Sequence, residues 1–315
     1  MFLGDTILRL FLLCEFCIGV IGNTVLFVLY MYTFLTQPDL KKPIDFIFMH
    51  LTVVNMLTIV FTLMPDIMSS FGVSHFLDDV GCKAVLYIFR VTRGLSICTT
   101  SLMSTFQAIT VCPGNSKWAW LKSKLSNWIF PSFAFFWITN MLIYIYIIEM
   151  VIAKSNVTLI GHGYSDAYCQ SRHFGNHNFR PLVSVTLIQD LLFVVLMMWT
   201  SLYMVHVLYR HHRRAQHVHS SSLSSQSSPE NKATYSILLL VSCFVFFYCS
   251  NNIMTLVTFY TPEKIHRLQV ISGILSSCYP TICPFLLMKN TKIISKFISS
   301  WSVIRITFSK NEFNG

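Results

Sequence analysis

Hydrophobic residues gather in seven long runs, separated by short stretches in which charged and polar residues are frequent. A helix needs about 20 mostly apolar residues to cross a bilayer, and each run reaches that length. The third run is the least hydrophobic, because Arg90 and Arg93 interrupt it. The pattern predicts an all-α membrane protein, a seven-transmembrane helix bundle forming one domain over residues 1–315. The predicted helices span residues 7–33, 44–69, 82–111, 128–151, 181–209, 233–260 and 268–288.

Lysine and arginine predict the orientation of these helices. They concentrate in the connections after the first, third and fifth helices and in the C-terminal segment. Connections rich in positive charge stay in the cytoplasm, so we expect a cytoplasmic C-terminus and, with an odd number of spans, an N-terminus outside. Asn156 begins an Asn-Val-Thr glycosylation triplet in the connection between the fourth and fifth helices. That connection is predicted to lie outside, where N-glycosylation occurs.

Composition agrees with a membrane protein. The chain is 54% hydrophobic and only 11% charged, whereas soluble domains carry about 25% charged residues. Its net charge of +10 comes from basic residues in short loops beside apolar runs. That placement indicates membrane orientation and contact with anionic lipid headgroups, and it argues against nucleic acid as a partner.

Two of the ten cysteines stand apart from the others. Eight lie within predicted helices or at their edges, where a free cysteine behaves as a small hydrophobic residue. Only Cys82 and Cys169 fall on the predicted outer side, which is an oxidising compartment. We therefore expect a disulfide bond between them, joining the start of the third helix to the second outer loop.

Charged residues inside predicted helices point to a ligand site. Charges within a membrane are costly and usually face the bundle interior or a water-filled cavity. The six in question all fall in the outer halves of their helices: Glu15, Asp66, Arg90, Arg93, Glu149 and Asp190. Asp66 and Glu149 lie near helix ends and are compatible with the membrane interface instead. Arg90 and Arg93 share a helix face, with Phe89 one turn from Arg93. Phe89, Arg90, Arg93 and Asp190 are therefore candidate ligand-binding residues in an outward-open cavity.

Enzyme chemistry finds no support in the sequence. There is no glycine-rich phosphate loop, paired metal-ligand spacing or nucleophile elbow, so we expect no catalytic residue, no metal and no cofactor. Four histidines gather in the third inner loop, predicted to be flexible over residues 210–232: His211, His212, His217 and His219. Their Arg and Ser neighbours favour a solvated basic loop over a metal site. The serine-rich run 220–228 is compatible with a phosphorylated segment or a plain linker.

The residues resemble those of a known family. The most specific stretch covers residues 209–219, 227–230 and 232–234, and continues into the sixth helix over residues 237–248. Shorter matches are Gly22-Asn23, His50-Leu51, Gln107-Ala108-Ile109-Thr110 and Pro284-Phe285. Together they cover nearly the whole chain and resemble the vomeronasal type-1 receptors, a branch related to the rhodopsin-like G-protein-coupled receptors.

The resemblance implies a pheromone receptor in the plasma membrane of sensory neurons of the vomeronasal organ. Such a receptor binds small, often volatile chemosignals in the outer half of the bundle and activates a heterotrimeric Gi/o-type G protein. Gln107 stands where the wider rhodopsin-like group has its G-protein-contacting arginine, and Asn55 where that group has a sodium-binding aspartate. The resemblance therefore does not extend to that arginine lock or sodium site. Gln107, Arg210 and Arg213 are expected at or near the G-protein coupling surface, and for the two arginines anchoring to lipid headgroups is an equal alternative.

Other classes of protein fit the sequence less well. A bitter-taste-type receptor shares the bundle, but the Cys82 and Cys169 pair and the third-loop match count against it. A transporter is expected to show two related halves, and seven spans without an internal repeat do not divide that way. An integral-membrane enzyme lacks a catalytic cluster at one depth.

Overall fold

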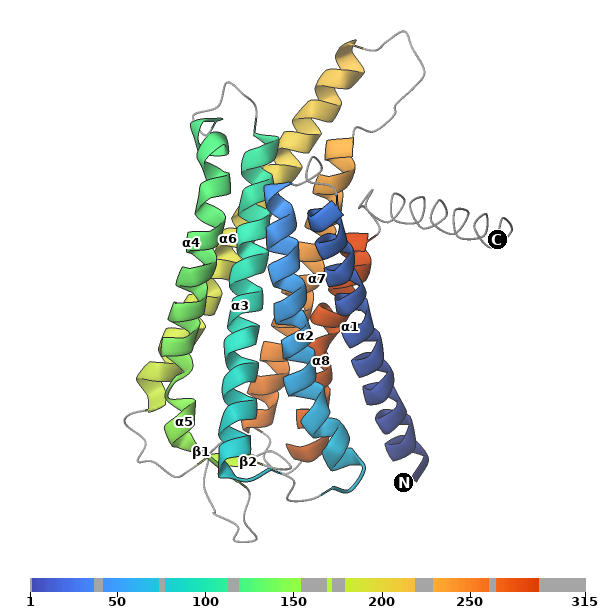
Figure 1. Cartoon of the computed structure of the whole chain (residues 1–315), viewed down its shortest axis with the longest axis vertical. Helices are drawn as coiled ribbons and strands as arrows, with labels where there is room; N and C mark the ends of the chain where they lie inside the picture. The colour runs from blue at the N-terminus through green and yellow to red at the C-terminus, as the bar shows by residue number, and fades with distance from the viewer. Residues whose placement is uncertain are drawn as a thin grey trace, which may run out of the picture.

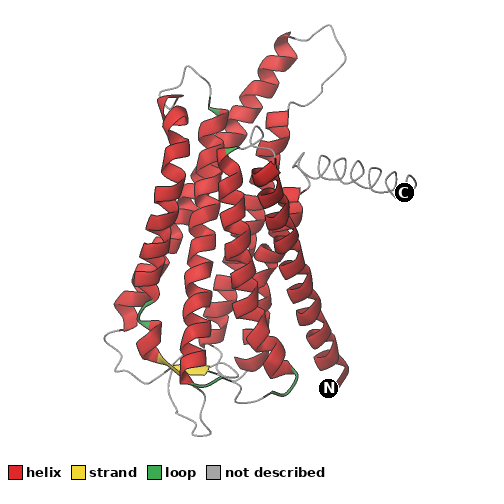
Figure 2. Ribbon diagram, viewed as in Figure 1, coloured by secondary structure: helices red, strands yellow, loops and turns green. Residues whose placement is uncertain are grey.

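The computed structural model describes residues 2–36, 42–73, 77–112, 119–153, 169–171, 179–218, 229–260 and 265–288. Within them, seven long helices run side by side, with one short helix and two short strands at one end (Figures 1 and 2). The long helices are α1 (Phe2–Thr36), α2 (Pro43–Ser70), α3 (Asp79–Val111), α4 (Ala119–Tyr144), α6 (Phe179–Val218), α7 (Pro229–Tyr260) and α8 (Ile265–Met288). The short elements are α5 (Ile147–Met150), β1 (Val151–Ala153) and β2 (Cys169–Ser171).

Six helical segments of the described chain are long and apolar enough to cross a membrane. They lie in every long helix except α3: Thr6–Thr36, Pro43–Ser70, Lys124–Glu149, Ile188–Arg210, Thr234–Met254 and Val270–Met288. The finding supports an all-helical membrane protein.

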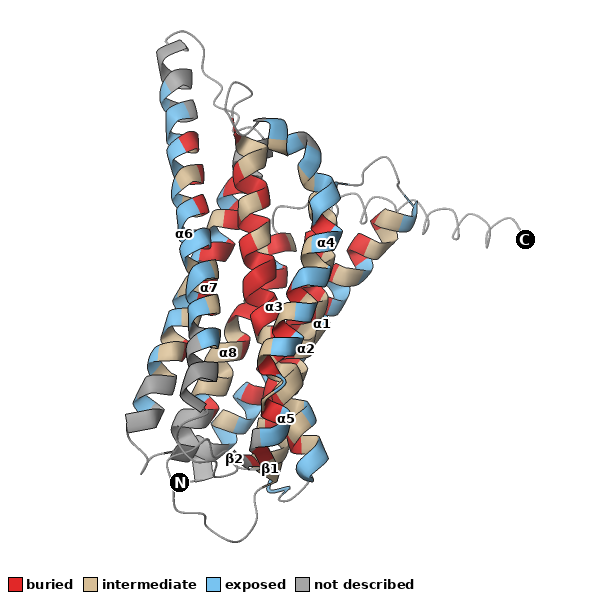
Figure 3. Cartoon of the chain, turned by 90° about the vertical axis from the view of Figure 1, so that its left-hand side faces the viewer, coloured by how far each residue is buried: buried red, intermediate tan, exposed pale blue. Residues whose placement is uncertain are grey.

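Helix α3 differs because it lies in the centre of the bundle. It packs against α2, α4, α6 and α7, and most of its residues from Val91 to Ala108 are buried (Figure 3). Many of these are small or hydroxyl-bearing, and their polar groups bond to neighbouring helices. By contrast, α4 and α6 expose large apolar side chains such as Trp128, Phe135 and Trp199. A helix that contacts lipid needs apolar side chains on its surface. A helix enclosed by other helices, such as α3, needs fewer of them.

Small residues let several helices approach closely. A Cβ atom added at Gly19 of α1 would lie 2.7 Å from Thr281 Oγ1 of α8, and one at Gly22 would lie 3.1 Å from the Pro284 ring. The same close contact joins α3 to α4, where Gly94 packs against the Asn140 side chain. Close packing of this kind drives helix association where lipid removes the hydrophobic driving force.

The two strands form an antiparallel hairpin beside the start of α3. Ala153 pairs with Cys169, and the Ala153 amide donates a hydrogen bond of 2.6 Å to the Asp79 carboxylate. The predicted disulfide bond is present between Cys82 and Cys169. It fastens the hairpin to α3. We call this the hairpin end of the bundle; the N-terminus lies at the same end (Figure 1).

The structure differs from the predicted boundaries in two regions. The fourth helix, predicted over 128–151, begins at Ala119 and ends at Tyr144, and the residues beyond form α5 and β1. The third loop, predicted as flexible over 210–232, starts inside α6 and ends inside α7, since α6 continues to Val218 and α7 begins at Pro229. Helix α6 therefore projects past its neighbours at the end opposite the hairpin (Figure 1).

Candidate functional site

Two of the predicted ligand-binding residues meet between α3, α6 and α7. The Tyr248 hydroxyl of α7 donates a hydrogen bond of 2.9 Å to Asp190 Oδ2 of α6. The guanidinium carbon of Arg93, on α3, lies 5.4 Å from the centre of the Tyr248 ring. Arg93 Nη2 also donates to Asn252 Oδ1, one turn further along α7, at 3.5 Å. Tyr248 therefore links a cation on α3 to a carboxylate on α6.

We call Arg93, Tyr248 and Asp190 the cluster, and its charges partly compensate one another. Asp190 is only 7% exposed, and both Arg93 and Arg90 act on it electrostatically. A buried carboxylate needs donors or positive charge around it, and here it has the Tyr248 hydroxyl and two arginines. Arg93 balances Asp190, and Arg90 beside them adds a second positive charge, so the three charges together are net positive. They can therefore attract an acceptor or an anionic group of a small molecule.

Phe89 and Arg90 lie beside the cluster on α3. Both are half-buried, and the Arg90 guanidinium carbon lies 5.7 Å from the centre of the Phe89 ring. Such a cation–π contact holds the arginine side chain against an apolar surface. The structure places these two residues next to the Arg93 group without bringing them into the hydrogen bonds that join Arg93, Tyr248 and Asn252.

Sequence reasoning missed Tyr248 and Asn252 as site residues. The two residues are four positions apart in the apolar run of α7, so they share a helix face. Asn252 Nδ2 donates a hydrogen bond of 2.8 Å to the Tyr248 carbonyl oxygen. An asparagine in a membrane-spanning run is unusual enough to have served as a signal. Its partner Arg93 is 159 residues away in sequence, so the pairing itself was not visible.

A second polar group extends from the cluster toward α4. Gln189, which precedes Asp190, donates to Asn140 Oδ1 at 3.3 Å, and Asn140 Nδ2 contacts the Cys98 sulfur at 3.7 Å. Gln189 Oε1 is buried without a hydrogen-bond partner among the described residues. An unpaired buried acceptor beside the Asp190 group is one that a ligand or an ordered water can satisfy.

The predicted coupling residues lie near the end opposite the hairpin. Gln107 of α3 is 6% exposed, and its Nε2 donates a hydrogen bond of 3.1 Å to Thr234 Oγ1 of α7. Arg210 and Arg213 are exposed on the part of α6 that projects from the bundle. Gln107 is therefore an interhelical contact, whereas the two arginines face outward.

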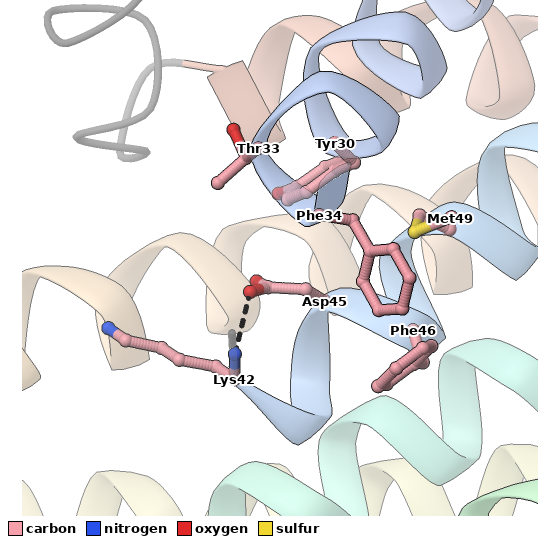
Figure 4. Close-up of a pocket in the computed structure, with 7 residues that line it drawn as sticks. All are labelled: Tyr30, Thr33, Phe34, Lys42, Asp45, Phe46 and Met49. Carbon is pink, nitrogen blue, oxygen red and sulfur yellow. Dashed lines mark hydrogen bonds between the residues drawn. The ribbon is translucent and has the colours of Figure 1, made fainter. Parts of the chain in front are cut away.

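A small crevice also occurs at that end, between α1 and the start of α2 (Figure 4). It is lined by Tyr30, Thr33, Phe34, Lys42, Asp45, Phe46 and Met49. The Lys42 amide donates to Asp45 Oδ2 at 3.0 Å, which closes the first turn of α2. None of the predicted ligand-binding residues lines this crevice.

Some predictions lie beyond what the structure describes. Asn156, the predicted glycosylation site, and the whole serine-rich run 220–228 fall outside the described residues. Within the described chain, no group of three or more His, Cys, Asp or Glu side chains is arranged to hold a metal ion.

Comparison with known proteins identifies the family. Residues 6–300 match the model of the vomeronasal organ pheromone receptor family. The chain is 37% identical over 292 residues to vomeronasal type-1 receptor 4 of Homo sapiens, covering 92% of this chain and 96% of that protein. It is 36% identical to human vomeronasal type-1 receptor 2 over 88% of this chain and 70% of that one. It is also 29% identical to olfactory receptor class A-like protein 1 of Danio rerio, over 90% of each chain. The chain belongs to the vomeronasal type-1 receptor family, whose members are multi-pass plasma-membrane chemosensory receptors and not enzymes.

Proposed function

We propose that this receptor detects a small chemosignal at the cluster of Arg93, Tyr248 and Asp190 and passes the signal to a Gi/o-type G protein. The observation that carries the proposal is the position of Tyr248. Its hydroxyl donates a hydrogen bond to Asp190 of α6, and its ring contacts Arg93 of α3. A change at either residue therefore acts on the same side chain of α7. A molecule that competes for Arg93 or Asp190 changes the forces on α7.

The proposal includes seven membrane spans, with the hairpin end outside and the C-terminus in the cytoplasm. Helix α3 serves as the remaining span, enclosed by α2, α4, α6 and α7. Three features of the chain support this orientation. The basic residues concentrate toward the opposite end, the disulfide bond lies at the hairpin end, and Asn156 follows β1. The whole chain then forms one receptor domain, with its basic loops against the lipid headgroups of the cytoplasmic leaflet.

The class of ligand follows from the charged groups of the cluster and the aromatic rings beside them. Arg90 and Arg93 together outweigh the charge of Asp190, and with the aromatic rings of Phe89 and Tyr248 they favour a small apolar molecule that carries an acceptor or an acidic group. Charge-assisted hydrogen bonds from a guanidinium to such a group are about twice as strong as neutral ones. The Gln189 acceptor adds a place for a ligand donor.

Signal transfer is a shift between two packings of the bundle. A ligand shifts that equilibrium only as far as it binds one packing better than the other. The Gln107–Thr234 hydrogen bond joins α3 to α7 at the cytoplasmic end, and Tyr248 joins the same two helices in the outer half. Movement of α7 relative to α3 therefore couples the two ends, and Arg210 and Arg213 on the α6 extension would meet the G protein.

The test is a cAMP assay in cells that express the chain with a Gi/o-type G protein. Pools of small volatile and steroid-like compounds are screened for a dose-dependent fall in stimulated cAMP. We expect pertussis toxin, which blocks Gi/o proteins, to abolish the response. A response that persists with the toxin would overturn the proposed coupling, and a response of equal size in cells without the receptor would remove its assignment to this chain.

A further inference from the structure

We propose that the contact between α1 and α8 holds a monovalent cation such as Na⁺, bound by Glu15, Ser277 and Thr281. The site is independent of the proposed ligand cluster, which is built from α3, α6 and α7. We call these three residues and their surroundings the α1–α8 seam.

Glu15 is a buried carboxylate, and one of its two oxygens has no hydrogen-bond partner in the described chain. It is 7% exposed, in the half of α1 nearest the hairpin end. Its Oε1 accepts a hydrogen bond of 2.8 Å from the Ser277 hydroxyl, whereas its Oε2 is buried without a partner among the described residues. The side chains that act on this carboxylate are Ser277 and Cys278, and neither is positively charged. Two neutral groups do not offset the cost of a charge inside a helix bundle.

Thr281 provides a second unused oxygen on the same side of α8. It lies one turn beyond Ser277 and is 8% exposed, and its Oγ1 has no hydrogen-bond partner within the described chain. The hydroxyl faces α1 at Gly19, which lies one turn beyond Glu15. Helices α1 and α8 thus run in register, with Glu15 beside Ser277 and Gly19 beside Thr281. Glu15 and Thr281 therefore lie one turn apart along this contact, and each has an oxygen without a hydrogen-bond partner in the described chain.

A second carboxylate strengthens the negative potential of the seam. Asp66 of α2 packs against Gly273 of α8, where an added Cβ atom would lie 2.5 Å from Asp66 Oδ2. Gly273 lies one turn from Ser277 on the opposite side from Thr281. Two carboxylates therefore approach α8 within a single turn, which makes the electrostatic potential there more negative.

The chemistry and the space favour a small inorganic cation. Hard cations are bound by carboxylate, hydroxyl and carbonyl oxygens and by water, and the seam offers a carboxylate and two hydroxyls. The Ser277 hydroxyl lies within hydrogen-bond distance of Glu15 Oε1 and of the Gly273 and Ile274 carbonyls, and in each case it is the donor, so its oxygen keeps lone pairs for a cation. An organic ammonium does not fit, because α1 and α8 approach closely at Gly19. One carboxylate in direct reach suits a monovalent ion, because the pair is then neutral, whereas a divalent ion would leave a net positive charge inside the helix bundle.

The experiment is a thermal unfolding series on the purified full-length receptor in detergent. Choline chloride is replaced stepwise by NaCl at constant ionic strength. We expect the wild-type melting temperature to rise and saturate with Na⁺, by roughly 2–4 °C overall. Glu15→Gln keeps the shape of the side chain and removes its charge, so we expect no rise. Thr281→Val removes one oxygen ligand and should shift the half-saturating Na⁺ concentration upward by roughly tenfold.

Glu149→Gln is the matched control, because Glu149 is an exposed carboxylate at the same end of the bundle. It should keep the wild-type Na⁺ response. A wild-type melting temperature that is independent of Na⁺ would overturn the proposal and indicate a protonated Glu15 or an ordered water. An unchanged Na⁺ response in Glu15→Gln, or its loss in Glu149→Gln, would equally contradict the assignment. None of these outcomes depends on finding a ligand or a G-protein response.

Discussion

Asp190 and Glu15 are both 7% exposed, yet they lie in opposite kinds of surroundings. Asp190 receives the Tyr248 hydroxyl and lies near two arginines, so its charge is balanced by the protein. Glu15 meets a serine and a cysteine, and one of its oxygens has no partner in the described chain. The comparison shows that a buried charge alone does not define a role. At the proposed ligand cluster, Asp190 is balanced by the protein and joins α6 to α7, whereas Glu15 is left unbalanced and calls for a partner from outside the chain.

The largest effect is expected from Asp190→Ala. It leaves the Tyr248 hydroxyl unpaired and removes the counter-charge of Arg90 and Arg93, so we expect a loss of about 3 kcal/mol of stability. Thermal unfolding of the detergent-solubilised receptor measures it. Asp190→Asn, which can still accept from Tyr248, should lose clearly less. Equal losses for the two variants would show that the balance of charge outweighs the hydrogen bond.

Gly19→Ala probes the other side of the comparison. The added methyl group would meet Thr281 Oγ1 and the Ile59 side chain, at 2.7 and 2.6 Å. Forcing the helices apart should cost about 2 kcal/mol and also weaken any Na⁺ response. The same unfolding series detects both effects. Unchanged stability in this variant would mean that α1 and α8 are not in close contact at this level.

Tyr248→Phe separates the two functions of this side chain. It removes the hydroxyl donor to Asp190 and keeps the ring under Arg93, so we expect a loss of about 1–2 kcal/mol. Tyr248→Ala removes both and should cost more. If phenylalanine were as stable as tyrosine here, the arginines would suffice to balance Asp190 without the hydroxyl.

The smallest effect is expected from Gln107→Ala. It breaks the hydrogen bond to Thr234, worth about 1 kcal/mol, which corresponds to about a fivefold change in the ratio of the two packings. We expect it to alter signalling more than ligand binding. Basal and maximal cAMP responses, corrected for surface expression, measure the change. Identical signalling in wild type and variant would remove Gln107 from the coupling path.

The sequence predicted best what the bilayer itself requires. Long apolar runs identify the helices, and the third is present as helix α3 although Arg90 and Arg93 interrupt its run. Its membrane span stays a prediction, because the six apolar segments long enough to cross a membrane do not include α3. The Cys82–Cys169 disulfide bond could be predicted because only these two cysteines fall on the predicted outer side, where the compartment is oxidising. The hairpin was missed because each strand has only three residues and no alternating pattern. The helical extension beyond Arg210 was missed because its polar composition is typical of a loop.

The cluster of Arg93, Tyr248 and Asp190 was harder to predict. The sequence shows which residues share a helix face, but it does not show which residues of other helices they contact. Arg93 and Asp190 stood out as charges in apolar runs. Tyr248 did not, since tyrosine is common in membrane helices, and its partner Asp190 lies 58 residues away. Glu15 was recognised as a buried charge, but its partner Ser277 lies 262 residues away, and a serine in an apolar run carries no signal of its own.

The most direct test of the account is the concentration–response curve of an activating compound from the screened pools, compared between wild type and Arg93→Gln at matched surface expression. Losing a charge-assisted contact of about 1.5–3 kcal/mol should raise the half-maximal concentration by roughly 10- to 100-fold, with the maximal response retained. Glu149→Gln should leave the curve unchanged. An Arg93→Gln curve that coincides with the wild-type curve would contradict the claim that the ligand binds at the cluster of Arg93, Tyr248 and Asp190.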